Sequence, residues 1–211
     1  MKVNQLFAGL MAAVLLASAP VMAENPGKKV AKTTAKATTY TVDATQSVLN
    51  WNGKKVTGEH YGTVNISKGN LIADGGKLTG GTVEIDLRTI TSTDLKDNKE
   101  YHDKLIGHLK NDDFFGVDKY PTATFKITKV TPKGGNQYDI VGDLTIKGKT
   151  APATFPATVT TSGNTITANG KATIDRTKYD IRYGSKSFFS NIGDKAINDD
   201  FTVDMKVVAK K

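Results

Sequence analysis

Residues 201–207 read Phe-Thr-Val-Asp-Met-Lys-Val, a strict alternation of apolar and polar side chains. This pattern predicts a β-strand with one buried and one wet face, because successive strand side chains point to opposite sides. The same period of two recurs within residues 83–87, 155–159 and 166–174. Short glycine-containing reversals separate such segments from Tyr40 onward, which predicts hairpins and therefore antiparallel pairing. The pattern is typical of an all-β domain.

Residues 97–110 depart from this pattern and predict one short amphipathic helix. Tyr101, Leu105 and Leu109 are spaced to share one stripe of a helix. Asp97, with Glu100 three residues later, is placed to cap its start. A single helix among about eight strands would lie across one opening of a barrel or sandwich.

Three inward positions of the strand predicted within 166–174 carry small residues, Ala168, Gly170 and Ala172. A packed core would favour bulkier side chains there, so these positions are expected to leave room inside. A barrel of about eight strands either fills with side chains or holds one small ligand. The alternation alone leaves both interpretations open.

The N-terminal region predicts export. Residues 1–23 combine Lys2, an apolar run and small residues before Glu24, the order of a cleavable signal peptide. Residues 24–39 hold four lysines and almost no large apolar residue, which predicts a disordered linker. Residues 40–211 are then the mature domain, periplasmic where an outer membrane exists and secreted otherwise. No transmembrane segment is expected after cleavage.

Several functional classes are disfavoured by composition and motifs. The net charge of +8 is partly carried by the N-terminal region, and no basic-aromatic motif accompanies it, so nucleic acid is not an expected partner. The chain has no cysteine, which excludes disulfides and thiolate chemistry. No nucleophile elbow, phosphate-binding loop or same-face histidine pair is present, so we expect no catalytic residue, cofactor or metal.

Residues 107–125, which read GHLKNDDFFGVDKYPTATF, closely resemble the signature of the YceI-like family. Further blocks resemble the family in order along 40–211: Val42-Asp43 followed by Ser47, residues 142–148, Ile174-Asp175-Arg176, and Tyr179 through residues 192–194. Gln46 departs from the pattern, since the family often has His just before that Ser. A role of this His therefore cannot be carried over to this chain.

The resemblance implies a lipocalin-like antiparallel β-barrel that is exported and binds a polyisoprenoid or similar long-chain lipid, such as an isoprenoid quinone or a fatty acid derivative. Alternation then predicts the residues that line the ligand site. They are Trp51, Val64, Ile66, Val83, Ile85, Phe125, Leu144, Phe155, Ile174, Phe201 and Val203. Packed core is the alternative for every one of them.

Polar and aromatic residues near the predicted helix suggest how the site opens. Phe114 and Phe115 are expected to form a gate, or else to plug the barrel end as ordinary core. His108, Arg176 and Tyr179 are candidates for a polar head group, since arginine offers a bidentate fork. Structural histidine and an ordinary ion pair of Arg176 are the alternatives.

Three functions compete on this evidence. The first is a carrier or sequestering protein for an apolar chain, which is not an enzyme. The second is a structural or stress-protective protein with a filled barrel. The third is an enzyme acting on a hydrophobic substrate, for which His108 or Asp112 would be needed. A homodimer is left open.

Overall fold

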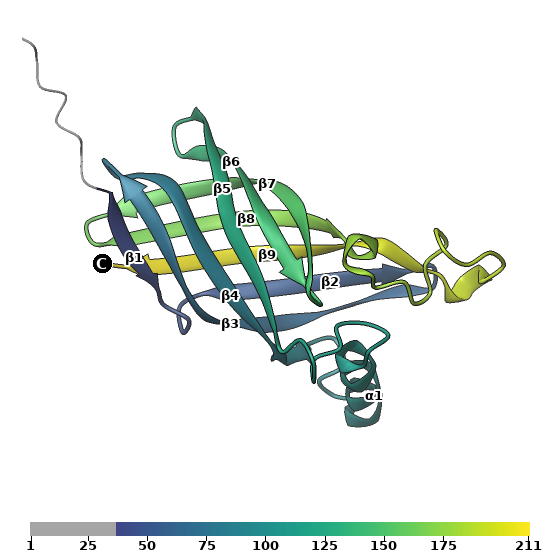
Figure 1. Cartoon of the computed structure of the whole chain (residues 1–211). Helices are drawn as coiled ribbons and strands as arrows, with labels where there is room; N and C mark the ends of the chain where they lie inside the picture. The colour runs from purple at the N-terminus through teal and green to yellow at the C-terminus, as the bar shows by residue number, and fades with distance from the viewer. Residues whose placement is uncertain (1–36) are drawn as a thin grey trace, which may run out of the picture. The chain divides into compact units, whose positions relative to one another are not determined.

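The computed structural model describes residues 37–211 (Figure 1). The predicted signal peptide and most of the predicted linker lie outside these residues. The strands are β1 Thr38–Val42, β2 Val48–Lys55, β3 Gly58–Asp74, β4 Lys77–Ser92, β5 Thr122–Gly134, β6 Gln137–Ile146, β7 Lys149–Ser162, β8 Thr165–Asp175 and β9 Ile197–Lys210. Strand β1 thus begins two residues inside the segment predicted as linker.

Strands β2 to β9 form a closed antiparallel barrel. Each pairs with its neighbour in sequence, and β2 also pairs with β9, with Trp51 opposite Val203. Closure leaves no free sheet edge. The predicted all-β barrel of about eight strands is confirmed.

Strands β1 and β2 lie end to end between the same two neighbours, β3 and β9. Tyr40 of β1 pairs with Leu71 of β3, and Val42 of β1 pairs with Ala209 of β9. The turn from Asp43 to Ser47 interrupts this composite strand. The Asp43 carboxylate accepts hydrogen bonds from the Thr45 amide and hydroxyl and from the Lys210 ammonium at 2.7 Å. Ser47 Oγ accepts a hydrogen bond from the Val208 backbone amide. Side chains of the turn therefore bond to β9 where the composite strand is interrupted; we call these contacts the seal.

Tight turns join most of the strands. Lys147 and Gly148 both have positive φ, as do Gly75 and Gly76, which suits the twist of two-residue hairpins. The turns therefore alternate between two barrel ends. One end holds the β3–β4, β5–β6 and β7–β8 turns, and the other holds the β2–β3 and β6–β7 turns with the only α-helix of residues 37–211.

Helix α1 spans Lys99–Lys110 and packs beside β4. Its N-cap is Asn98, whose side chain accepts from the Tyr101 amide, so the prediction that Asp97 caps the helix is wrong. The predicted stripe is only partly correct. Leu105 and Leu109 pack against the core, but Tyr101 is 60% exposed and Ile106 is buried instead.

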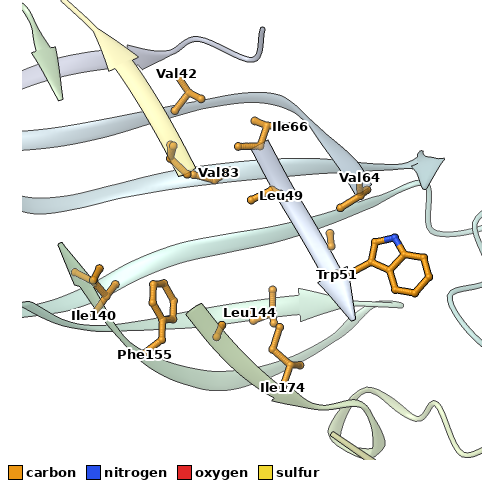
Figure 2. Packing of buried hydrophobic residues seen from close by; sticks show 14 of the residues in the cluster. Val42, Leu49, Trp51, Val64, Ile66, Val83, Ile140, Leu144, Phe155 and Ile174 are labelled. Atoms are coloured by element: carbon orange, nitrogen blue, oxygen red, sulfur yellow. The ribbon is translucent and has the colours of Figure 1, made fainter. Parts of the chain in front are cut away.

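The barrel interior divides into two halves. In the half away from α1, which we call the filled half, aromatic rings occupy the interior. Figure 2 shows one of them, Phe155, beside Ile140. Phe155 faces Ile140 across the β6–β7 pair, and its ring centroid lies 5.4 Å from that of Phe125. The half beside α1, which we call the hollow half, contains Trp51, Val64, Leu144 and Ile174 and encloses a cavity.

The prediction that small inward residues leave empty space inside the barrel is wrong in the filled half. A Cβ at Gly170 would lie 3.2 Å from the Phe155 ring. A Cβ at Gly142 would lie 2.4 Å from the Phe125 ring. Neither Ala168 nor Ala172 lines the cavity either. The space that small residues create on one strand is taken by a ring from the next.

Candidate functional site

The hollow half contains an apolar cavity of about 140 Å³. A dry cavity of roughly this size can hold a molecule such as benzene. Side chains from β2, β3, β4, β5, β6, β8 and β9 surround it, together with the helix and two loops. The lining consists of Leu49, Trp51, Gly53, Val64, Ile85, Leu87, Ile90, Leu109, Phe114, Phe115, Ala123, Leu144, Ile146, Ile174, Arg176, Ile181, Ile197, Asn198, Asp200, Phe201 and Val203.

Trp51 is the only tryptophan of the chain and forms part of the cavity wall on β2 (Figure 2). Its indole Nε1 donates to the carbonyl of Thr91 at 3.1 Å, across β3 on strand β4. The indole therefore has its polar atom satisfied and presents its apolar surface to the cavity.

An irregularity in β4 contributes two further wall residues. The β3–β4 register shifts between Thr63 and Asn65, so residues 87–90 form a bulge. The Thr89 hydroxyl stabilises it by donating to the Asp86 carbonyl at 2.6 Å. As a result Leu87 and Ile90, three positions apart, both face the cavity.

Phe114 and Phe115 close the helix side of the cavity. The chain turns back on the end of α1, with the Phe114 amide donating to the Asn111 carbonyl and the Phe115 amide to the Leu109 carbonyl. Gly116 follows with φ of 57°, a left-handed conformation that glycine adopts at low cost. Phe115 packs edge-on to Phe201 inside, at 6.5 Å between ring centroids.

His108 lies outside the phenylalanine pair and does not line the cavity. Its ring meets Phe114 and Tyr183 edge-on, with centroid distances of 4.9 and 4.5 Å. Its Nε2 is 3.9 Å from the Asp113 carboxylate. Phe114 therefore separates the cavity from a half-exposed aromatic layer, consistent with the position expected of a gate.

Arg176 is 4% exposed and touches the cavity. Its guanidinium donates to the carbonyls of Ile181, Ile197 and Asn198 at 2.9 to 3.1 Å, and to the Asp199 carboxylate at 3.4 Å. Burial lowers the pKa of Arg176. Four of its five N–H groups are thus used by the β8–β9 loop and the start of β9, so at most a single donor is left for a head group.

Tyr179 is fully buried and does not line the cavity. Burial raises the pKa of its hydroxyl to about 12, so it stays neutral at physiological pH. The structure therefore does not bring the three head-group candidates together. Only Arg176 contacts the cavity, whereas Tyr179 lies in the core and His108 lies near the surface.

The predicted lining residues fall into two groups. Those that line the cavity are Trp51, Val64, Ile85, Phe114, Phe115, Leu144, Ile174, Phe201 and Val203. Those that lie in the filled core are Ile66, Val83, Phe125 and Phe155, which are not in the cavity wall. Their inward orientation is as predicted, but they occupy the half of the barrel that is packed.

Other wall residues were missed. Leu49, Leu87 and Ile146 share the alternation of residues that were predicted, so the sequence carried a signal for them. Ile181 and Ile197 come from the β8–β9 loop and the start of β9, for which alternation carries no signal. Leu109 was assigned to the helix stripe but not to the ligand site.

Gln46, where the family often has His, lies in the exposed turn between β1 and β2. Its backbone N–H donates to the carbonyl and carboxylate of Asp43. It does not contribute to the cavity wall. The departure from the family pattern therefore falls outside the cavity.

The carboxylate of Asp112, close in sequence to Phe114 and Phe115, is engaged in an ion pair. Lys119 donates to Asp112 at 2.7 Å and holds the pKa of that carboxyl below its usual range. An ionised carboxylate of this kind is poorly suited to act as a general acid. Within residues 37–211, no group of three histidine or acidic side chains is arranged to hold a metal ion.

The chain belongs to the YceI-like domain family, whose profile matches residues 40–209. It is 35% identical over 103 residues to a UPF0312 protein of Vibrio parahaemolyticus, covering 49% of this chain and 51% of that protein. It is 36% identical over 104 residues to the protein YceI of Shigella flexneri, with 49% and 51% coverage. The matched segment thus spans about half the length of these curated relatives.

Solved structures share the fold. BcnA of Burkholderia cenocepacia is 27% identical, with a TM-score of 0.64 over 80% of this chain and 99% of that one. A domain of Saccharophagus degradans, described as polyisoprenoid-binding and implicated in plant cell wall breakdown, is 18% identical. Its TM-score is 0.59, over 81% of this chain and 97% of that one. The latter likeness supports the barrel fold alone.

Proposed function

We propose that this protein binds an apolar lipid chain of the polyisoprenoid class in its hollow half, as a carrier or sequestering protein that catalyses no reaction. The observation that supports this most is the cavity, whose wall is almost entirely aliphatic and aromatic and whose closure depends on Phe114 and Phe115. A domain of the same fold is described as polyisoprenoid-binding, and we extend that ligand class to this chain as part of the proposal. We place the carrier in the periplasm, on the basis of the signal peptide predicted in residues 1–23.

The size of the cavity limits how much of such a ligand can be buried without a rearrangement. Burying one five-carbon isoprene unit gains roughly 3–4 kcal/mol at about 0.8 kcal/mol per carbon group. Association costs about 4–15 kcal/mol. The cavity of about 140 Å³ holds roughly one such unit. Binding therefore requires more units to be covered, and displacement of Phe114 and Phe115 is the step that extends the cavity.

A second function, a structural or stress-protective protein with a filled barrel, is favoured by the same small volume. The filled half already shows that this fold can close over a packed interior. An enzyme that uses His108 and Asp112 has no comparable support, because Asp112 pairs with Lys119 and His108 faces Asp113.

Native mass spectrometry of the exported protein, followed by lipid extraction, distinguishes the first two functions. A bound species with an isoprenoid or other long-chain mass supports the carrier. Protein that is empty and takes up no added prenol supports the filled barrel.

Trp51 provides a second, local readout. Because it is the only tryptophan and lies in the cavity wall, a brominated long-chain prenol bound there should quench its fluorescence. A matched control combines Trp51→Phe with Tyr138→Trp, which moves the fluorophore to the filled half. Quenching in the control equal to that of the wild type would contradict binding in the hollow half.

A further inference from the structure

Exposed aromatic residues gather beyond the hollow half, in the loop between β8 and β9. Phe188 is 44% exposed and Phe189 is 49% exposed, and Tyr183 in the same loop is also exposed. The turn between β2 and β3 adds Val56, which is more than half exposed. We call these two segments, residues 54–59 and 182–196, the tip; Figure 1 shows them projecting at the same end of the barrel.

The base of the tip is held in place, so the aromatic exposure does not result from a loosely attached loop. The Ile197 amide donates to the Gly184 carbonyl at 2.8 Å, and the Val56 amide to the Ala196 carbonyl at 3.1 Å. Ser187 Oγ donates to Asp199 at 2.5 Å. Arg176 holds the carbonyls at both ends of the loop. Two of these anchoring residues, Arg176 and Ile197, also line the cavity.

Basic residues outnumber acidic ones in the tip. The tip carries five basic residues against two acidic ones, Lys54, Lys55, Arg182, Lys186 and Lys195 against Glu59 and Asp194. Lys54 pairs with Glu59, and Arg182 pairs with Asp180 and lies over the Phe188 ring at 4.6 Å. Within residues 37–211, no ion pair engages Lys55, Lys186 or Lys195. Their charge is available to an anionic surface.

We propose that the tip docks on an anionic lipid bilayer, with Phe188 and Phe189 inserted among the head groups and Lys55, Lys186 and Lys195 facing the lipid phosphates. A surface that combines exposed aromatic rings with an excess of basic residues suits the interface of an anionic membrane, where burial of the rings and attraction of the cations both favour binding. Docking in this way places the hollow half, and not the filled half, against the source of lipid. The inference goes beyond the proposed ligand and does not depend on its identity.

The test uses the full chain and a single cysteine, since the protein has none of its own. An environment-sensitive dye is attached at Ser190→Cys in the tip, or at Asn136→Cys in the β5–β6 turn of the opposite end. Vesicles of phosphatidylcholine, with or without phosphatidylglycerol, are then added. The expected result is a blue shift at position 190 with the anionic vesicles and none at position 136.

Two double variants separate the contributions of the rings and of the charges. Phe188→Ser with Phe189→Ser should weaken vesicle binding at least about tenfold, since each ring loses burial. Lys55→Glu with Lys186→Glu should weaken it about twentyfold or more, at roughly fivefold for each basic residue. Tyr101→Ser, which removes an exposed ring from α1, is the matched control and should leave binding unchanged.

Two outcomes would overturn the proposal. The first is vesicle binding without a shift at position 190, which would assign binding to the lysine-rich residues 24–39. The second is a shift at position 190 in the absence of vesicles together with a dimer in sedimentation, which would assign the tip to a second copy of the chain. Quenching of Trp51 by a prenol in detergent solution reports on the cavity separately, so failure of docking and failure of ligand binding are distinguishable.

Discussion

Glycines are used in opposite ways in the two halves of the barrel. In the filled half, Gly142 and Gly170 lie beside the rings of Phe125 and Phe155, and a Cβ there would come within 2.4 and 3.2 Å of those rings. In the hollow half, Gly53 lines the cavity, and a Cβ there would have nothing within 4 Å. At these three positions glycine therefore permits close packing beside a ring in the filled half and leaves space in the hollow half. The difference between them depends on whether the neighbouring strand supplies a ring.

The largest expected effect comes from removing a ring of the filled half. Phe155→Ala should lower the free energy of unfolding by about 3–5 kcal/mol, because it leaves a void in close-packed surroundings. Phe201→Ala borders existing space and should cost about half as much or less. Urea denaturation of the two variants measures the difference, and equal losses would remove the distinction between the halves.

A smaller effect is expected from adding a methyl group. Gly142→Ala would place its Cβ 2.6 Å from the Lys126 carbonyl oxygen as well as against the Phe125 ring, so strand β5 must shift. We expect a loss of about 1–3 kcal/mol in stability, typical of overpacking. Gly53→Ala is the matched control and should be nearly neutral by thermal unfolding. A destabilised Gly53→Ala would show that the space beside it is not free.

Filling the cavity should separate stability from binding. Ala123→Leu extends a buried side chain of the hollow half into the cavity, so stability should change by less than about 1.5 kcal/mol. Quenching of Trp51 by the brominated prenol should be lost. Ala157→Leu makes the same change in the filled half and should retain quenching in whatever fraction remains folded. The reverse pattern would place the ligand in the filled half.

The smallest effect concerns the seal between β1 and β2. The Lys210 hydrogen bond, followed by that of Thr45, holds the pKa of Asp43 well below its ordinary value of about 4. A carboxyl group whose pKa is lowered by folding stabilises the folded state at pH values above its ordinary pKa. This stabilisation is lost progressively as the pH falls below that ordinary pKa. Asp43→Asn should therefore show a smaller decrease in melting temperature between pH 7 and about pH 3 than the wild type. Identical decreases in melting temperature for the two proteins would mean that the hydrogen bonds of Asp43 do not contribute to the pH dependence of stability.

The comparison also explains which predictions were confirmed. Alternation identifies the inward face of a strand, and it did so correctly for Trp51, Leu144, Phe125 and Phe155 alike. It could not distinguish the first two, which line the cavity, from the last two, which fill the core. That distinction depends on Gly142 and Gly170, whose positions beside the rings arise only from strand register.

Two further features of the site lay beyond any local pattern. The bulge at residues 87–90 brings Leu87 and Ile90 to the same face, against the period of two. Arg176 was predicted as a head-group candidate, but its donors are used by carbonyls of the β8–β9 loop and of the start of β9. A residue type that suits a ligand can equally suit the backbone, and only the fold determines which partner lies within reach.

The sequence by itself determined that this chain forms antiparallel strands with one helix, which faces of those strands turn inward, and that tandem phenylalanines follow the helix. These depend on side-chain period and turn chemistry, which act over a few residues. The tertiary structure decided where the barrel is filled, where it is hollow and which loop closes it. Those outcomes depend on contacts between strands far apart in the chain, because an interior is packed or empty only according to what stands on its opposite wall.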